Sequence, residues 1–271
     1  IVPVTGENRV LTHFGLKQVN HDPRPGIKAM MQMANVKRRL GVSELVFTIG
    51  PRINAAGRIE HGRLAVELLL ARDQEQADQI GLRVDGNNTA RQELDKSITE
   101  SALERFATDE GLREAWSTVV FDAGWHKGVI GIVASRLIEQ YYRPTVVLTE
   151  SQGKAVGSAR SVKGFDVYEA INACSDLLDQ FGGHMYAAGL TMPLANVDAF
   201  RARFDEIVRA TLDPALQRHA EFVADAMLKQ YGPSYGVKQN AIVLMDHTGG
   251  VRAMVGGRDY GASQFNRATQ A

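Results

Sequence analysis

The sequence predicts an α/β protein in which a long connector helix leads to an α/β domain, followed by a partial α+β tail. The first observation is that apolar, strand-like runs alternate with helix-like segments between residues 118 and 208. That spacing favours a layered α/β domain with parallel strands. The second is a long polar stretch from Asp73 to Phe106, whose later part repeats an apolar residue every four positions.

The connector is expected to be a single helix. At 1.5 Å per residue it would span roughly 50 Å, which is long enough to separate two domains. A coiled-coil dimer is the alternative, although the stripe at Leu94, Ile98, Ala102 and Phe106 covers few heptads. We therefore divide the chain into four segments. Residues 1–72 are the end of a first domain, residues 73–112 are the connector, residues 113–210 are the α/β domain, and residues 211–271 are the tail.

The first segment begins with a polar opening, residues 1–26, punctuated by Pro and Gly. A helix is expected from Ile27 to Leu40, closed by Gly41, with its methionines in an ordinary core. A loop, Phe47 to Arg58, and a short apolar helix, Leu64 to Leu70, follow.

The α/β domain should contain four strands and three helices. We expect strands at 118–121, 144–148, 154–158 and around Gly182, and helices at 129–141, 167–178 and 197–208. In the tail, a helical face beginning near Leu216 should lead through a loop at 231–236 to two strands, 241–245 and 251–255, joined by a short connection at 246–250.

Composition limits the classes of function. The 271 residues are 44% hydrophobic and 23% charged with zero formal net charge, so nucleic acid could be bound only through a local patch. The single cysteine, Cys174, excludes an internal disulfide and a Cys-rich zinc site, and its helical spacing predicts a buried thiol. No apolar run could span a membrane, and the first residues form no signal peptide. We expect a cytoplasmic protein whose sequence begins inside a domain.

Two short stretches in the α/β domain suggest an anion site. Gly182 and Gly183 precede His184 and would let another molecule approach the backbone. Upstream, Ser158, Arg160 and Ser161 are predicted to bind phosphate, since they offer two hydroxyls and a guanidinium. The alternative is a tight turn in which the histidine merely satisfies a neighbouring carbonyl.

Two further stretches extend the candidate site. Arg52, Asn54 and Arg58 flank small residues and would place guanidinium groups on an approachable backbone, unless the arginines form surface ion pairs. His126 and Gly128 lie in a glycine-rich loop that opens a helix, an arrangement that aims backbone N–H groups at an anion. Trp125 in this loop would either stack on a base or pack in the core.

Over residues 1–210 these stretches resemble the DHH/DHHA1 phosphoesterase superfamily and, within it, the RecJ family of single-strand-specific exonucleases. The resemblance implies 5′-to-3′ hydrolysis of single-stranded DNA by two divalent metals, commonly manganese or magnesium. The family's Asp-His-His triplet does not occur here. We therefore expect no catalytic residue, metal ligand or cofactor in this chain, with a catalytic domain supplied in trans. Another DHH/DHHA1 phosphodiesterase, acting on short oligonucleotides or cyclic dinucleotides, is the nearest alternative.

Residues 211–271 resemble the start of the transpeptidase domain of class A penicillin-binding proteins. The matching stretches are Thr211 to Gln217, Val251 to Tyr260 and Ser263 to Ala268. No Ser-x-x-Lys nucleophile motif occurs within residues 211–271. A piece of a cell-wall transpeptidase is thus a further alternative, for the tail alone, and we expect the tail to have no catalytic role.

Overall fold

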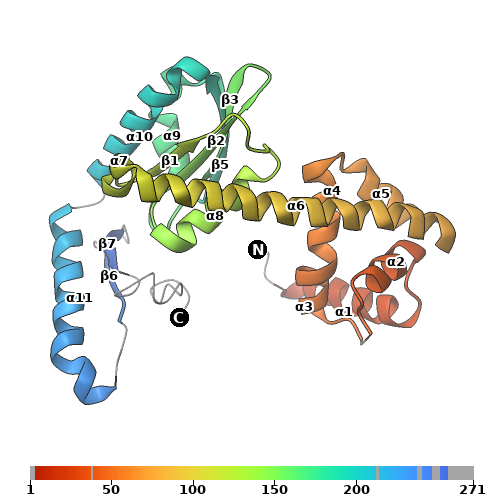
Figure 1. Ribbon diagram of the computed structural model, residues 1–271. Helices are drawn as coiled ribbons and strands as arrows, with labels where there is room; N and C mark the ends of the chain where they lie inside the picture. Colours follow the sequence, from red (N-terminus) through yellow and green to blue (C-terminus); the bar gives the residue numbers. More distant parts are fainter. Residues whose placement is uncertain (1–3, 38, 212–213, 237–239, 246–250, 256–271) are drawn as a thin grey trace. The chain divides into compact units, whose positions relative to one another are not determined.

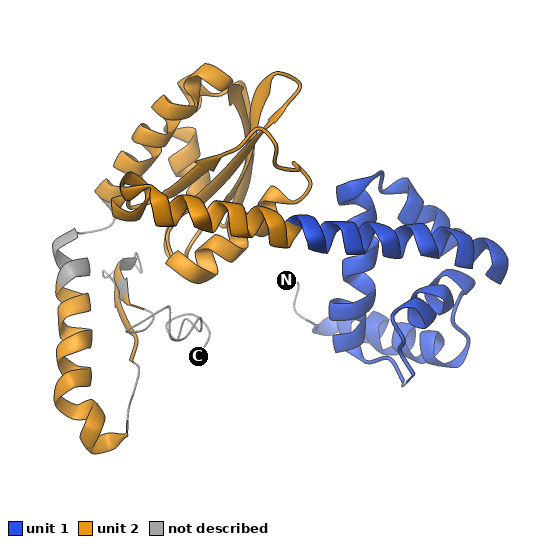
Figure 2. Ribbon diagram, viewed as in Figure 1, with its two compact units in different colours: residues 1–94 blue, residues 95–271 orange. Residues whose placement is uncertain are grey.

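The computed structural model describes residues 4–37, 39–211, 214–236, 240–245 and 251–255. The chain forms two compact units, Ile1–Leu94 and Asp95–Ala271 (Figure 2). The boundary lies inside helix α6 (Gln74–Thr108), the predicted connector, which is continuous over 35 residues. The division into four segments remains a prediction. Within the described ranges, no helix has the length and apolar character needed to cross a membrane.

The secondary structure described for the first unit consists of helices joined by short connections (Figure 1). It contains α1 (Gly6–His21), α2 (Pro25–Met33), α3 (Val42–Glu44), the π-helical turn η1 (Leu45–Ile49), α4 (Gly50–Ile59), α5 (Arg63–Leu70) and the first part of α6. Met30, Leu68 and Val84 are among its most buried side chains, and Met31 and Met33 pack against the same core. The core interpretation of the methionines is therefore confirmed.

Two expectations for this unit were wrong, and one helix was not predicted. Residues 1–26 contain helix α1, which buries none of its residues and so lacks the apolar stripe that would reveal it. The helix expected from Ile27 to Leu40 ends at Met33, because Asn35 adopts a left-handed conformation with φ of 52°. The expected loop at 47–58 is helical, formed by η1 and α4.

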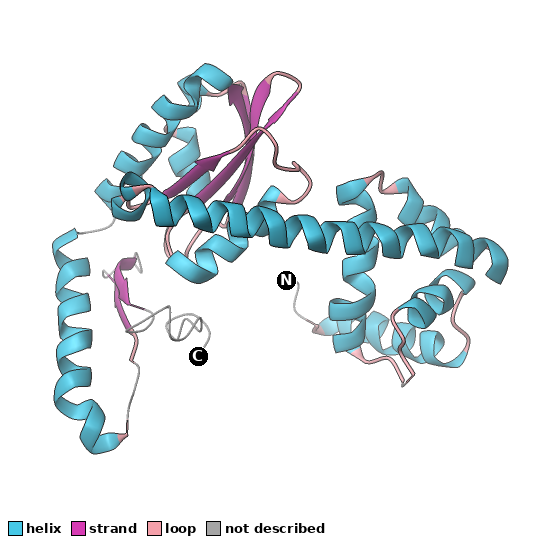
Figure 3. Cartoon of the chain, in the orientation of Figure 1, coloured by secondary structure: helices cyan, strands magenta, loops and turns pink. Residues whose placement is uncertain are grey.

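The second unit is built on a five-stranded sheet (Figure 3). Its strands are β1 (Thr118–Phe121), β2 (Thr145–Ser151), β3 (Lys154–Arg160), β4 (Gln180–His184) and β5 (Ala187–Pro193), in the order β1-β2-β3-β5-β4. The α/β fold class is confirmed, but the expected parallel pairing holds only for β1 and β2. Two-residue connections follow β2 and β4, and a connection that short can join only antiparallel strands.

Helices cover the two faces of this sheet. α8 (Ile130–Tyr141) packs against β2 and β3 on one face, and α9 (Val167–Asn172) and α10 (Val197–Thr211) lie on the other (Figure 1). The short helix α7 (Glu110–Glu114) and the 3₁₀ turns η2 (Ser175–Leu177) and η3 (Leu194–Asn196) complete the unit. Phe200 and Phe204 from α10 are fully buried in the main core.

Cys174 belongs to this core and is fully buried, as predicted. The helix expected at 167–178 is interrupted at this cysteine, between α9 and η2. Burial raises the pKa of the thiol to about 11, because the thiolate would have to form without water around it. A neutral, buried thiol acts as a small apolar side chain.

The last described residues form helix α11 (Pro214–Tyr235) and an antiparallel pair, β6 (Ile242–Met245) and β7 (Val251–Val255). The two predicted strands are confirmed, whereas α11 continues through much of the expected loop at 231–236. The connection at 246–250 and the stretches Gly256 to Tyr260 and Ser263 to Ala268 lie outside the described residues. Ala220, Ala224, Ala253 and Val255 form a small core of their own.

We expect a chain ending at Thr211 to melt within about 4 °C of the full chain, the shift that about 1 kcal/mol produces at this size. Among the residues whose burial the structure describes, the main core of the second unit includes none beyond Val208, and the tail's core includes none before Ala220. Thermal unfolding followed by circular dichroism would measure the difference. A much lower melting temperature in the shortened chain would show that the tail is integrated into the unit.

Candidate functional site

One face of the sheet of the second unit carries four of the predicted site residues. In an antiparallel pair, directly opposite residues project to the same face. Three rows follow from the register of β3, β5 and β4: Val156–Thr191–Gln180, Ser158–Gly189–Gly182 and Arg160–Ala187–His184. We call these nine residues the open face. The sheet therefore brings together Ser158, Arg160, Gly182 and His184, which lie far apart in the sequence.

The middle row is almost bare of side chains. A Cβ atom at Gly182 would meet nothing within 4 Å, and one at Gly189 would meet only the Gly157 carbonyl oxygen at 3.9 Å. Both glycines are exposed. The row is thus a stretch of backbone that another molecule can approach closely.

Gly183 has a different role from its neighbour. Its φ is 153°, and a Cβ there would lie 2.3 Å from the Ala187 carbonyl oxygen and 2.5 Å from the Ala188 Cα. Both glycines lie within strand β4, so the strand expected around Gly182 is confirmed and the tight-turn alternative does not hold at these two residues. The turn falls at Met185 and Tyr186 instead, which are both exposed.

The Arg160 guanidinium is held in a fixed position at one edge of the glycine row. Its Nη1 donates to Ser158 Oγ at 2.9 Å and to the Ala159 carbonyl at 2.7 Å. A Cβ at Gly131, in the first turn of α8, would lie 2.8 Å from both Arg160 Nη2 and Ser158 Oγ. A glycine at position 131 therefore lets the backbone of α8 pack closely on the guanidinium. The sequence did not indicate Gly131 as a site residue, although it did indicate the glycine-rich loop just before it.

His184 and Ser161 flank the β4–β5 turn. His184 is exposed, and its Nδ1 accepts from the Tyr186 N–H at 3.2 Å, so it contacts the turn as the structural alternative proposed, through an N–H rather than a carbonyl. Ser161 donates its hydroxyl to the Phe165 carbonyl at 2.5 Å. The bond made by Ser161 closes the loop that follows β3. The second ring nitrogen of His184, Nε2, lies on an exposed side chain.

The glycine-rich loop before α8 borders the open face. His126 Nδ1 accepts from the Gly128 N–H at 3.2 Å, and its carbonyl accepts from the Val129 and Ile130 N–H groups. Trp125 is 7% exposed with the Arg105 guanidinium over its ring, which favours the core interpretation over base stacking. Lys127 lines a hollow of about 410 Å³, together with Val156 and several polar residues that include Thr191.

Arg52, Asn54 and Arg58 lie on α4 in the first unit. Asn54 and Arg58 are exposed, whereas the Arg52 side chain is only 18% exposed. Arg52 donates through Nε to Asp85 at 2.8 Å and through Nη1 to the Thr48 carbonyl at 2.9 Å. These contacts favour the ion-pair alternative for Arg52. All three residues belong to the first unit, whereas the open face belongs to the second.

We expect Arg52→Ala and Asp85→Ala each to lower the free energy of unfolding by about 1 kcal/mol, since each removes one partner of a half-buried, charge-assisted bond. Chemical denaturation of both variants, and of the double variant, would measure the coupling. If Arg52→Ala leaves stability unchanged and weakens binding of single-stranded DNA, the ion-pair interpretation is wrong.

A bound divalent metal would need a cluster of carboxylate, imidazole or thiolate side chains. Among those that the structure describes, no group of three or more His, Cys, Asp or Glu side chains could hold a metal ion. The described residues thus offer no fit for a two-metal centre, which needs several carboxylate or imidazole ligands. The chemistry of the open face is that of guanidinium, hydroxyl, imidazole and bare backbone.

Comparison with known families finds a domain match within the second unit. Residues 115–210 match the DHHA1 domain. The chain is 39% identical to the single-stranded-DNA-specific exonuclease RecJ of Bacillus subtilis over 215 residues, which cover 78% of this chain and 27% of that protein. It is 34% identical to RecJ of Salmonella typhimurium over 251 residues, covering 88% of this chain and 43% of the relative.

Solved structures are similar as well. RecJ from Thermus thermophilus in complex with Mg²⁺ matches 77% of this chain and 32% of that chain, with a TM-score of 0.69 and 33% identity. An exonuclease RecJ bound to manganese matches 77% of this chain and 51% of that one, with a TM-score of 0.65 and 32% identity. This chain spans less than half the length of the curated relatives from Bacillus and Salmonella.

The matches do not support a resemblance between the tail and penicillin-binding transpeptidase domains. The Salmonella match covers 88% of the chain, more than its first 210 residues contain, so it extends into the tail. A catalytic domain supplied in trans finds no support either. What the comparisons establish is a DHHA1 domain match at residues 115–210, within a chain that is similar to the RecJ exonucleases over most of its own length.

Proposed function

We propose that this chain is the strand-holding part of a RecJ-like, 5′-to-3′, single-strand-specific exonuclease, and that its open face binds the backbone of single-stranded DNA. The observation that carries the proposal is the fixed Arg160 guanidinium beside Ser158, at the edge of the exposed Gly182–Gly189 row. A guanidinium fork suits phosphate oxygens, and bare backbone lets a sugar-phosphate chain come close.

The remaining predicted residues would add contacts around this centre. His184 extends the Arg160 row, and the loop from His126 to Gly128 lies before α8. Gly183 shapes β4, and Ser161 closes the adjacent loop, so both act by positioning. Asn54 and Arg58 would form a separate patch on the first unit. Contacts to phosphate carry no base-edge information, so these groups would bind all sequences alike.

Cleavage would require groups that we do not find in the described part of the chain. We propose that the chain binds single-stranded DNA without hydrolysing it, because hydrolysis in the resembled family uses two divalent metals. The relatives with solved structures carry Mg²⁺ or Mn²⁺. Incubation with Mn²⁺ and 5′-phosphorylated single strands should release no mononucleotide, and chelator-sensitive release would contradict this.

Binding to labelled oligonucleotides tests the proposal itself. Fluorescence anisotropy should show binding to single strands that weakens with salt, with a slope of roughly 0.7 in log affinity against log salt for each phosphate contacted. An oligonucleotide series also tests the alternative, a phosphodiesterase for short oligonucleotides or cyclic dinucleotides. Affinity that rises with length supports a strand-holding face, and equal affinity for dinucleotides supports the alternative. Salt-independent binding, or none, would refute the proposal.

A further inference from the structure

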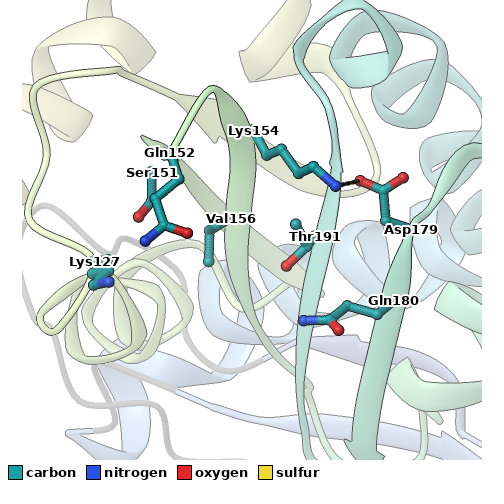
Figure 4. Close-up of a pocket in the computed structure, with 8 residues that line it drawn as sticks. All are labelled: Lys127, Ser151, Gln152, Lys154, Val156, Asp179, Gln180 and Thr191. Carbon is teal, nitrogen blue, oxygen red and sulfur yellow. Dashed lines mark ion pairs between the residues drawn. The ribbon is translucent and has the colours of Figure 1, made fainter.

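A polar hollow lies at the end of the open face away from Arg160. It encloses about 410 Å³, within the range of small-molecule sites, and Val156, Gln180 and Thr191, which form the first row of the open face, line it (Figure 4). Val156 and Arg160 are four residues apart on β3, about 13 Å at the rise of a strand. A group in the hollow would therefore belong to a different nucleotide from one whose phosphate meets Arg160.

The hollow and the glycine row are continuous. A second hollow of about 420 Å³ is lined by Gly182 and Gly189 and shares Val156, Gln180 and Thr191 with the first. A Cβ at Gly182 would meet nothing within 4 Å, so the space above this glycine is open. A single strand crossing the glycine row would be led towards the polar hollow.

The lining of this hollow is mostly neutral and polar, with Lys127 adding one positive charge beyond the pair formed by Lys154 and Asp179. The Lys154 ammonium lies 3.1 Å from the Asp179 carboxylate, so the two charges largely offset each other (Figure 4). The Gln180 amide offers both a donor and an acceptor, and the Thr191 hydroxyl offers the same pair. Nucleobase edges present donors and acceptors in the same way, and Val156 gives a planar ring an apolar surface to lie on.

We infer that this hollow is a nucleobase subsite, in which Gln180 and Thr191 hydrogen-bond the edge of one base of the strand held by the open face. The inference rests on the proposed function and adds one base contact to a surface that otherwise recognises backbone. It assigns Gln180 and Thr191 a part in binding that the sequence did not suggest.

An abasic walk tests the inference on the full chain. Oligonucleotides each lacking one base, at successive positions, are titrated against the parent chain and a Gln180→Ala, Thr191→Val double variant. In the parent, loss of the base at one position should lower affinity about three- to tenfold, the effect of one or two hydrogen bonds. In the variant this penalty should fall below about twofold, with the salt slope unchanged. Gln180 is exposed and Thr191→Val nearly preserves shape, so we expect the variant to fold.

Gln140→Ala is the matched control, because Gln140 lies near the C-terminal end of α8 and outside the open face. It should keep the full abasic penalty. A penalty at no position, or one that persists in the variant, would overturn the base subsite. A variant that weakens intact and abasic strands alike would mean that the hollow holds the backbone of the strand and not a base, and would overturn it too. If Arg160→Ala still weakens binding in those cases, the proposed function survives, whereas no binding at all refutes both.

Discussion

Replacing Gly183 by Ala should destabilise the second unit by about 3 kcal/mol or more. The added Cβ would lie 2.3 Å from the Ala187 carbonyl oxygen, and the backbone at φ of 153° is one that side-chain-bearing residues rarely adopt. The atoms in the way are backbone atoms of the neighbouring strand β5, so they can move only by disturbing the β4–β5 pair. The melting temperature should fall by about 6 °C or more.

Gly182→Ala is the matched control for that prediction. The same substitution one residue earlier meets nothing within 4 Å, so stability should change by less than about 0.5 kcal/mol. The methyl group would nevertheless stand on the glycine row and should weaken binding of single-stranded DNA. Thermal melts and DNA titrations of both variants separate the two roles. Equal loss of stability in both variants would contradict the distinction between a shaping glycine and a contact glycine.

Arg160→Ala should weaken binding of single-stranded DNA about tenfold, or about 1.4 kcal/mol, for every sequence tested. The guanidinium is already oriented by its bonds to Ser158 and the Ala159 carbonyl, so little side-chain entropy is lost when a phosphate binds. The salt slope should fall by roughly 0.7, the contribution of one phosphate contact. Anisotropy titrations at several salt concentrations would measure both effects.

Arg209→Ala is the appropriate control, because it removes the same charge from α10, on the opposite side of the sheet. Its affinity and salt slope should stay close to those of the parent. Equal losses in the two variants would mean that binding responds only to net charge. An Arg160→Ala chain that binds like the parent would leave Ser158 and Arg160 as structural residues.

The sequence predicted the elements whose patterns are local. The long helix α6 has an apolar stripe in its second half, and the strands of the second unit are short apolar runs, so both were anticipated. Helix α1 buries no residue and therefore carries no such stripe. The prediction of parallel strands was wrong for most of the sheet. The connections after Ser151 and His184 are only two residues long, and such short connections join antiparallel strands.

The candidate site was only partly predictable for a different reason. The phosphate-suited residues Ser158, Arg160 and His184 stand out by chemical type, whereas Gln180 and Thr191 are ordinary polar residues in a strand. They become candidates only because the register places them opposite Val156 and beside a hollow. Likewise, Gly131 matters through its approach to Arg160, which depends on how α8 packs on β3.

Photo-cross-linking tests the central claim, that the open face holds the strand, most directly. A single-stranded oligonucleotide carrying one photoreactive thymine analogue would be irradiated with the full chain, and the linked peptide identified by mass spectrometry. Tyr186 is 53% exposed in the β4–β5 turn, next to His184. The account predicts that the main linked peptide spans β4 and β5, and that Arg160→Ala reduces its yield. Linkage confined to α9, α10 or the first unit would contradict it.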